Sequence, residues 1–70
     1  MSWIQRKNFL LGEGRRIAQG RTSHITAEEW LFAYREIKDE LSGVQAEIFE
    51  KLRFAVERIC LEKALEVVAV

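Results

Sequence analysis

Apolar side chains recur every three or four residues over the C-terminal two-thirds of the chain, from about residue 25 to residue 68. The positions are Trp30, Tyr34, Ile37, Leu41, Val44, Ile48, Leu52, Ala55 and Ile59. This spacing predicts amphipathic helix. It continues in phase across Ser42-Gly43, which leaves two alternatives: two helices joined by a turn there, or one helix of about 40 residues. Usual helix lengths favour the first, in which Gly43 stands near a helix end and Ser42 caps the next helix against Gln45.

A helix-start signal opens this stretch. Thr26 and Glu29 have the spacing of a capping box, in which each side chain bonds the other residue's backbone N–H. Ile25 and Trp30 flank them at the spacing of a hydrophobic staple. We therefore expect a helix from Thr26 to about Leu41.

The stretch after Gly43 carries apolar side chains on two opposite faces of the predicted helix, at about 100° per residue. One broad face holds Val44, Ile48, Phe49, Leu52, Ala55, Val56, Ile59 and Cys60. The other holds Phe54, Leu61, Leu65 and Val68. A surface helix needs one apolar face, so the second face requires a cover. With Phe32, which stands among charged residues of the preceding helix, these four residues are the predicted partner or dimer interface.

Residues 2–19 predict a first helix. Ser2 and Gln5 form another possible capping box, and Gly20 is placed to end the helix. The glycines of Gly12-Glu13-Gly14 predict a bend or break, since glycine costs about 1 kcal/mol in a helix interior. We expect this helix to pack across the other two through Trp3, Ile4, Leu10, Leu11 and Ile17.

The chain has 70 residues and no proline, so glycines are its main punctuation. We expect an all-α fold in which residues 1–70 form a single helical domain. The domain consists of two or three helices, arranged as a helical hairpin or a bent rod. A core of this size is marginal alone, so a bundle-like homodimer is expected to complete it.

Charge is unevenly distributed although the net charge is zero. Residues 1–24 hold five basic and one acidic side chain, and residues 25–70 hold six basic and ten acidic ones, so the segments carry +4 and −4. The basic segment either packs on the acidic helices or binds an anionic partner. If that partner is nucleic acid, the candidate contacts are Arg6, Lys7, Arg15, Arg16 and Arg21.

Two other binding modes are less favoured. The helices around Ser42-Gly43 are spaced like a helix-turn-helix unit, but Glu47 and Glu50 would face the phosphates. The first helix has an apolar side and basic residues, which would also suit a membrane surface. The same apolar residues serve equally well as core.

Catalytic and metal-binding patterns are absent from the sequence. His24 is the one histidine, and no second histidine or cysteine stands at metal-ligand spacing. The run from Gly12 to Arg16 lacks the third glycine of a dinucleotide-binding loop. Cys60, the one cysteine, lies on the first apolar face and reads as a buried hydrophobe. We expect no enzyme activity, no metal and no cofactor.

A lone cysteine and apolar runs too short to span a bilayer predict a cytoplasmic protein without a membrane span. The leading functional hypothesis is a small non-enzymatic regulatory or adaptor protein. It would act by protein–protein interaction, with itself as a homodimer and with another protein. The alternative is a nucleic-acid-binding regulatory protein that uses the basic N-terminal segment.

Overall fold

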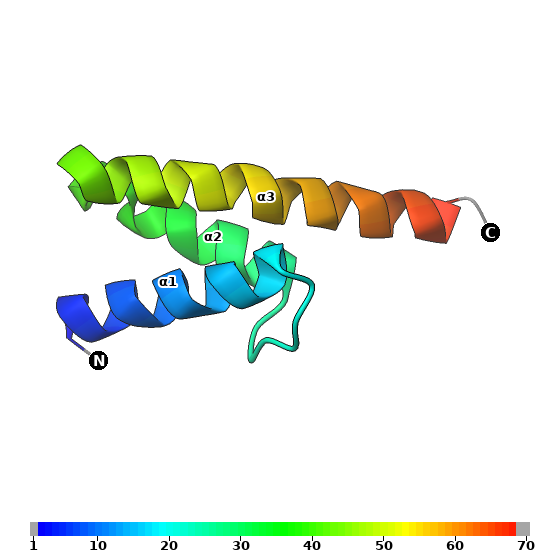
Figure 1. The fold of residues 1–70 in the computed structure, drawn as a ribbon, viewed down its shortest axis with the longest axis horizontal. Helices are drawn as coiled ribbons and strands as arrows, with labels where there is room; N and C mark the ends of the chain where they lie inside the picture. Colours follow the sequence, from blue (N-terminus) through cyan, green and yellow to red (C-terminus); the bar gives the residue numbers. More distant parts are fainter. Residues whose placement is uncertain (1, 69–70) are drawn as a thin grey trace.

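Three α-helices make up the part of the chain that the computed structural model describes, residues 2–68 (Figure 1). They are α1 (Trp3–Ala18), α2 (Ala27–Ile37) and α3 (Gly43–Val68), and a 3-10 turn, η1 (Lys38–Glu40), follows α2. Side-chain surroundings are described through residue 66. These residues contain no strand, so the predicted all-α class is confirmed, with three helices.

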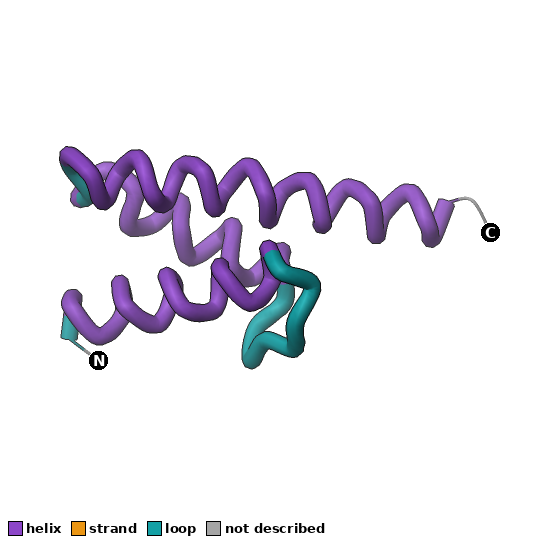
Figure 2. Tube along the Cα trace, in the orientation of Figure 1, coloured by secondary structure: helices purple, strands orange, loops and turns teal. Residues whose placement is uncertain are grey.

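The helices run up, down and up, with α1 and α3 pointing the same way and α2 returning between them (Figure 1). The connection between α1 and α2 is the longer one, and that between α2 and α3 is a tight turn (Figure 2). The 26 residues of α3 span about 39 Å at 1.5 Å per residue, close to the molecule's longest dimension of 41 Å. Its C-terminal part runs past the ends of the other two helices (Figure 1).

The helix is interrupted between α2 and α3 although the apolar spacing continues in phase, so the two-helix alternative is confirmed. The α-helix ends at Ile37, one 3-10 turn follows, and Leu41 is extended, with φ −87° and ψ 145°. Gly43 has φ +59°, in the left-handed region that favours glycine. It begins α3 rather than ending the helix before it. Together these residues reverse the chain while Leu41 still packs against the core.

Both predicted capping boxes are present. The Ser2 hydroxyl accepts from the Gln5 backbone N–H, and the Gln5 side chain accepts from the backbone N–H of Ser2. Thr26 and Glu29 make the same pair of bonds at the start of α2, at 3.1 and 2.9 Å. At the end of α1, Gly20 has φ +73° and follows the last turn, as its sequence position predicts.

A break at Gly12-Glu13-Gly14 is wrong, because α1 is a single helix through these residues. Gly14 is explained instead by packing. A Cβ atom at Gly14 would lie 2.8 Å from Nε1 of Trp30. That same Nε1 donates a 2.7 Å hydrogen bond to the backbone carbonyl of Leu10. The missing side chain therefore lets the indole of α2 reach the backbone of α1.

The core is a stack of aromatic rings surrounded by aliphatic side chains. Trp30, Tyr34 and Phe49 lie parallel, with ring centroids 5.4 to 6.4 Å apart. The buried apolar residues are Leu10, Ile17, Ala27, Trp30, Tyr34, Ile37, Phe49 and Val56. All three helices contribute, so the core is complete within one chain.

Three residues predicted to face the core are exposed instead. Trp3 and Ile4, in the first turn of α1, precede the part of that helix that is buried, which begins at Leu10. Val44 is 70% exposed. The buried stripe of α3 is centred on Phe49, and a residue five positions away lies about 140° around the helix, so Val44 falls outside that stripe.

Candidate interaction surfaces

The second apolar face predicted for the third helix is exposed in the structure. Phe54, Leu61 and Leu65 are 64%, 59% and 66% exposed. Each lies roughly 120–160° around α3 from the buried Phe49. Lys51, one turn before Phe54, and Arg58 lie on the same side of the helix, and we call these five residues the outer face of α3.

Residues 61–66 of α3 are all exposed. This is the part of the helix that runs past α1 and α2 (Figure 1). Val68, also predicted for the interface, has a side chain outside the described residues. The helix thus carries apolar side chains where nothing in the described chain covers them.

Ion pairs border the outer face. The Arg53 guanidinium lies 4.3 Å from the ring centroid of Phe54 and bonds Glu50 and Glu57 at 2.6 Å. Hydrogen bonds from Arg53 and then from Tyr34 lower the pKa of Glu50. Burial, followed by the bond to Glu50, raises the pKa of Tyr34. Phe54 is therefore held beside a fixed charge network.

Phe32 is 66% exposed on α2. The residue after it, Ala33, lines a groove of about 460 Å³ between α1 and α2. The groove is lined by Arg6, Phe9, Leu10, Ile25, Glu29 and Ala33. Phe9 in its wall is 39% exposed, so the groove offers a second apolar surface, separate in sequence from the outer face of α3.

The five basic residues predicted for nucleic-acid contact divide into two groups. Arg6 forms an ion pair with Glu36 of α2, and Lys7 donates a 3.1 Å hydrogen bond to the side chain of Gln45 on α3. Arg15, Arg16 and Arg21 are exposed and make no ion pair with any described residue. Arg15 and Arg16 stand in the last turn of α1, where positive charge favours the helix dipole.

A buried carboxylate that sequence reasoning missed ties down the loop between α1 and α2. Glu13 is 4% exposed. Its Oε2 accepts a 2.9 Å hydrogen bond from the Ser23 hydroxyl and a longer one from the His24 backbone N–H, and its Oε1 faces Nδ1 of His24. Burial by itself would raise the pKa of Glu13. The hydrogen bonds from His24 and Ser23 outweigh burial, so the net pKa of Glu13 is lowered.

One signal in the sequence could have found this site. Glu13 is the one acid among residues 1–24. It lies three residues after Leu10 and four before Ile17, on the apolar side of α1. An acid at such a position needs polar partners, and the neighbouring loop supplies them.

Serine, histidine and glutamate together invite comparison with a nucleophilic triad, but the connections differ. In a triad the histidine bonds the serine hydroxyl and so activates it. Here Ser23 donates to Glu13 and accepts from the Ile25 backbone N–H. The serine hydroxyl is therefore engaged in holding the loop, not paired with His24.

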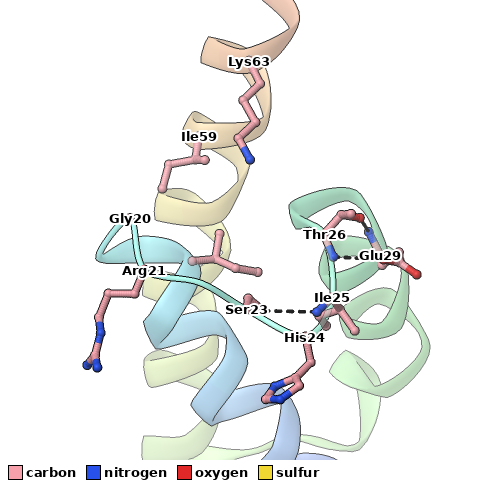
Figure 3. A pocket seen from close by; sticks show the side chains of 10 residues that line it. Gly20, Arg21, Ser23, His24, Ile25, Thr26, Glu29, Ile59 and Lys63 are labelled. Carbon is pink, nitrogen blue, oxygen red and sulfur yellow. Dashed lines mark hydrogen bonds between the residues drawn. The ribbon is translucent and has the colours of Figure 1, made fainter.

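The hollow beside this loop, of about 380 Å³, is shown in Figure 3. Thr26 and Glu29 on its wall are bonded to each other through the capping box, and the Arg21 side chain points away from it (Figure 3). Lys63 of α3 stands above it. Ser23, Thr26 and Glu29 on its wall thus use their polar atoms in hydrogen bonds that hold the loop and the start of α2.

Residues 2–68 contain no cluster of three or more histidine, cysteine or acidic side chains placed to hold a metal ion. No helix within them has the length and apolar character needed to cross a membrane. Cys60 is half-buried against the core. Protein-family models, curated proteins and solved structures were all compared with this chain, and none matches it.

Proposed function

We propose that this chain is a small non-enzymatic regulatory or adaptor protein that acts by binding proteins, first of all a second copy of itself. The observation that carries the proposal is the outer face of α3. Its three large apolar side chains are each about 60% exposed or more, on a helix whose other face already completes the core. Apolar side chains aligned in this way mark an interaction surface.

A homodimer is the simplest cover for this face. In a two-fold dimer the same patch meets itself, so one surface supplies both sides of the interface. The protomer's core is small, and association is a common source of further stability for a domain of this size. Phe32 on α2 and the groove between α1 and α2 would remain available for a second protein, which is the adaptor part of the proposal.

Sedimentation of matched variants tests the homodimer. We expect the wild-type protein to sediment as a dimer and Leu65→Asp to shift it toward monomer, because a carboxylate would replace an apolar contact in the interface. Ile4→Asp is the control, since Ile4 is 63% exposed against 66% for Leu65 but lies on α1. It should leave the dimer intact. A wild-type monomer, with Leu65→Asp as stable as wild type, would overturn the homodimer.

Nucleic-acid binding is a second candidate function. The exposed Arg15, Arg16 and Arg21 favour it, because cations without ion-pair partners among the described residues can neutralise phosphates. Arg6 and Lys7 support it less, since both already contact other helices.

A gel-shift series with duplex and single-stranded probes tests this candidate. Replacing Arg15 and Arg16 with alanine should weaken binding and reduce its salt dependence. The absence of any shift at low salt with either probe would eliminate the candidate. Binding that survives the double substitution would place the contact elsewhere.

A further inference from the structure

The outer face of α3 follows the spacing of a coiled-coil seam. From Lys51 through Phe54, Arg58 and Leu61 to Leu65, the steps are alternately three and four residues. That alternation is the heptad pattern by which one helix packs into another. The seam points away from the bundle, because the buried residues of α3 lie on its other side. A helix laid along it would meet neither α1 nor α2.

We propose that this seam pairs with the same seam of a second copy in antiparallel orientation, with Phe54 of each protomer opposite the partner's Leu65. The inference rests on the proposed homodimer and adds the orientation and the register of its helices. The two bundles then lie on opposite sides of the helix pair. Residues 61–66 of each α3 then run along residues 58–53 of the other.

Like charges disfavour the parallel orientation. In a parallel, in-register pair each residue of the seam faces its own copy, so Arg58 meets the partner's Arg58 and Lys51 meets the partner's Lys51. Glu57 and Glu62 flank the seam on opposite sides. A parallel pair places Glu57 of each protomer beside the partner's Glu62. Flanking charges of this kind set helix orientation in coiled coils.

The antiparallel orientation moves the two Lys51 side chains far apart and sets opposite charges beside each other at the centre of the interface. With Phe54 opposite the partner's Leu65, Arg58 is level with the partner's Leu61 and only one residue from the partner's Glu62. Arg58 and Glu62 already pair within one helix, with Nε and Oε1 3.4 Å apart, and both are well exposed. Two copies of this pair would then form one alternating group of four charges at the centre of the interface.

The apolar side chains select the register. Shifted one heptad in one direction, the antiparallel pair sets Phe54 against the partner's Arg58 and Leu61 against the partner's Lys51. Shifted one heptad the other way, it leaves Phe54 without a partner on the outer face. The proposed register brings Phe54 and Leu65 together twice by symmetry, so of the three it is the one that sets Phe54 against an apolar side chain of the outer face.

Spin labels outside the interface test the orientation. A label at Ser42→Cys, in a Cys60→Ala background, sits just before α3 and leaves the seam unchanged. In the antiparallel dimer the two labelled backbones lie about 50 Å apart along the helix axis, whereas in a parallel dimer they lie at the helix spacing of roughly 10 Å. We expect one intermolecular distance near the longer value, lost on dilution with unlabelled protein.

The outcomes separate this inference from the proposed function. A dimer with the short distance, or any other distance far from the long one, overturns the antiparallel pairing and leaves the homodimer standing. A protein that sediments as a monomer and shows no intermolecular distance overturns both.

Disulfide trapping tests the register. Phe54→Cys and Leu65→Cys, each with Cys60→Ala, should not cross-link alone, because two copies of either cysteine lie about 16 Å apart along the axis. Mixed together, they should form a disulfide-linked dimer under mild oxidation, since the two positions face each other. Mixing Phe54→Cys with Ile4→Cys is the control for random collision. A cross-link in Leu65→Cys alone, or none above the control in the mixture, overturns the register.

Discussion

Gly14 and Glu13 are neighbours on α1 whose roles depend on side chains from elsewhere in the chain. Gly14 leaves room for the Trp30 ring, and Glu13 supplies the carboxylate that holds Ser23 and His24. Within the described residues, every fully buried side-chain nitrogen or oxygen has a hydrogen-bond partner. Contacts of single residues, Gly14 with Trp30 and Glu13 with the loop, therefore fix how α1 packs against α2.

We expect Gly14→Ala to lower the free energy of unfolding by about 1–3 kcal/mol, the usual cost of overpacking a core. Trp30 is fully buried and anchored to the Leu10 carbonyl, so it cannot readily move away from the new methyl group. Gly12→Ala is the matched control, because nothing lies within 4 Å of its added Cβ. It should raise stability by about 0.5–1 kcal/mol. Urea melts of the two variants measure this. Equal increases in the urea midpoint for Gly14→Ala and Gly12→Ala would contradict the close packing at Gly14.

Glu13 makes stability depend on pH. Its pKa is lowered in the folded protein, so the ionised carboxylate stabilises the fold above its unfolded-state value of about 4.5. That stabilisation is lost as the pH falls through the lowered folded-state pKa. Glu13→Gln should therefore be less stable than wild type at pH 7, and the difference should narrow in acid.

Urea midpoints for wild type and Glu13→Gln, measured from pH 7 down to pH 3, check this expectation. Glu66→Gln, at an exposed position on α3, is the control for the general effect of removing one negative charge. A gap between Glu13→Gln and wild type that stays constant with pH would show that ionisation of Glu13 contributes nothing.

At the scale of elements, α2 and α3 differ in what holds them. α2 is short, begins with a complete capping box and buries Trp30, Tyr34 and Ile37 along one stripe. α3 is more than twice as long, but among its described side chains the fully buried ones are Phe49 and Val56, and none is fully buried after Val56. The part of α3 after Val56 is therefore helical without comparable cover.

Thr26→Ala should lower the free energy of unfolding by about 1 kcal/mol, the usual cost of a lost N-cap. The Thr26 hydroxyl accepts from the Glu29 backbone N–H at the start of the helix that carries most of the aromatic core. Ser2→Ala removes the corresponding bond at the exposed start of α1 and should cost less, since chain ends fray. Urea melts of the two variants decide it; an unchanged midpoint for Thr26→Ala would contradict the cap's role.

At the scale of the whole molecule, the protomer is an elongated bundle, 41 Å long and about half as wide. The basic N-terminal segment contacts both other helices, because Arg6 pairs with Glu36 of α2 and Lys7 bonds Gln45 of α3. The other three basic side chains of residues 1–24, Arg15, Arg16 and Arg21, lie at the end of α1 and in the loop after it. The proposed dimer and the alternative nucleic-acid site therefore use different parts of the molecule, and one does not exclude the other.

If the homodimer forms, the melting temperature should rise with protein concentration, because association stabilises the folded state by mass action. Leu65→Asp should melt at a lower temperature and lose the concentration dependence, whereas Ile4→Asp should keep it. Thermal melts over about a hundredfold range of concentration, wide enough to shift the dimer equilibrium, measure this. A wild-type melting temperature independent of concentration over that range would argue against the dimer.

The sequence by itself determined the all-α class, the starts of α1 and α2 and the second apolar face of α3. A capping box such as Thr26 with Glu29 involves residues three apart, and a helical face is set by residues three and four apart. Such local rules need no knowledge of the rest of the chain. They therefore also identified Phe54, Leu61 and Leu65 as a face without cover.

Only the tertiary structure decided how distant residues meet. It placed Trp30 against Gly14, so a glycine that predicts a break lies within a continuous helix. It brought the loop residues Ser23 and His24 onto Glu13. These contacts join residues 10 to 16 positions apart or bridge separate helices, and nothing in local spacing encodes them. They depend on how three helices pack around one core, which is a property of the folded chain.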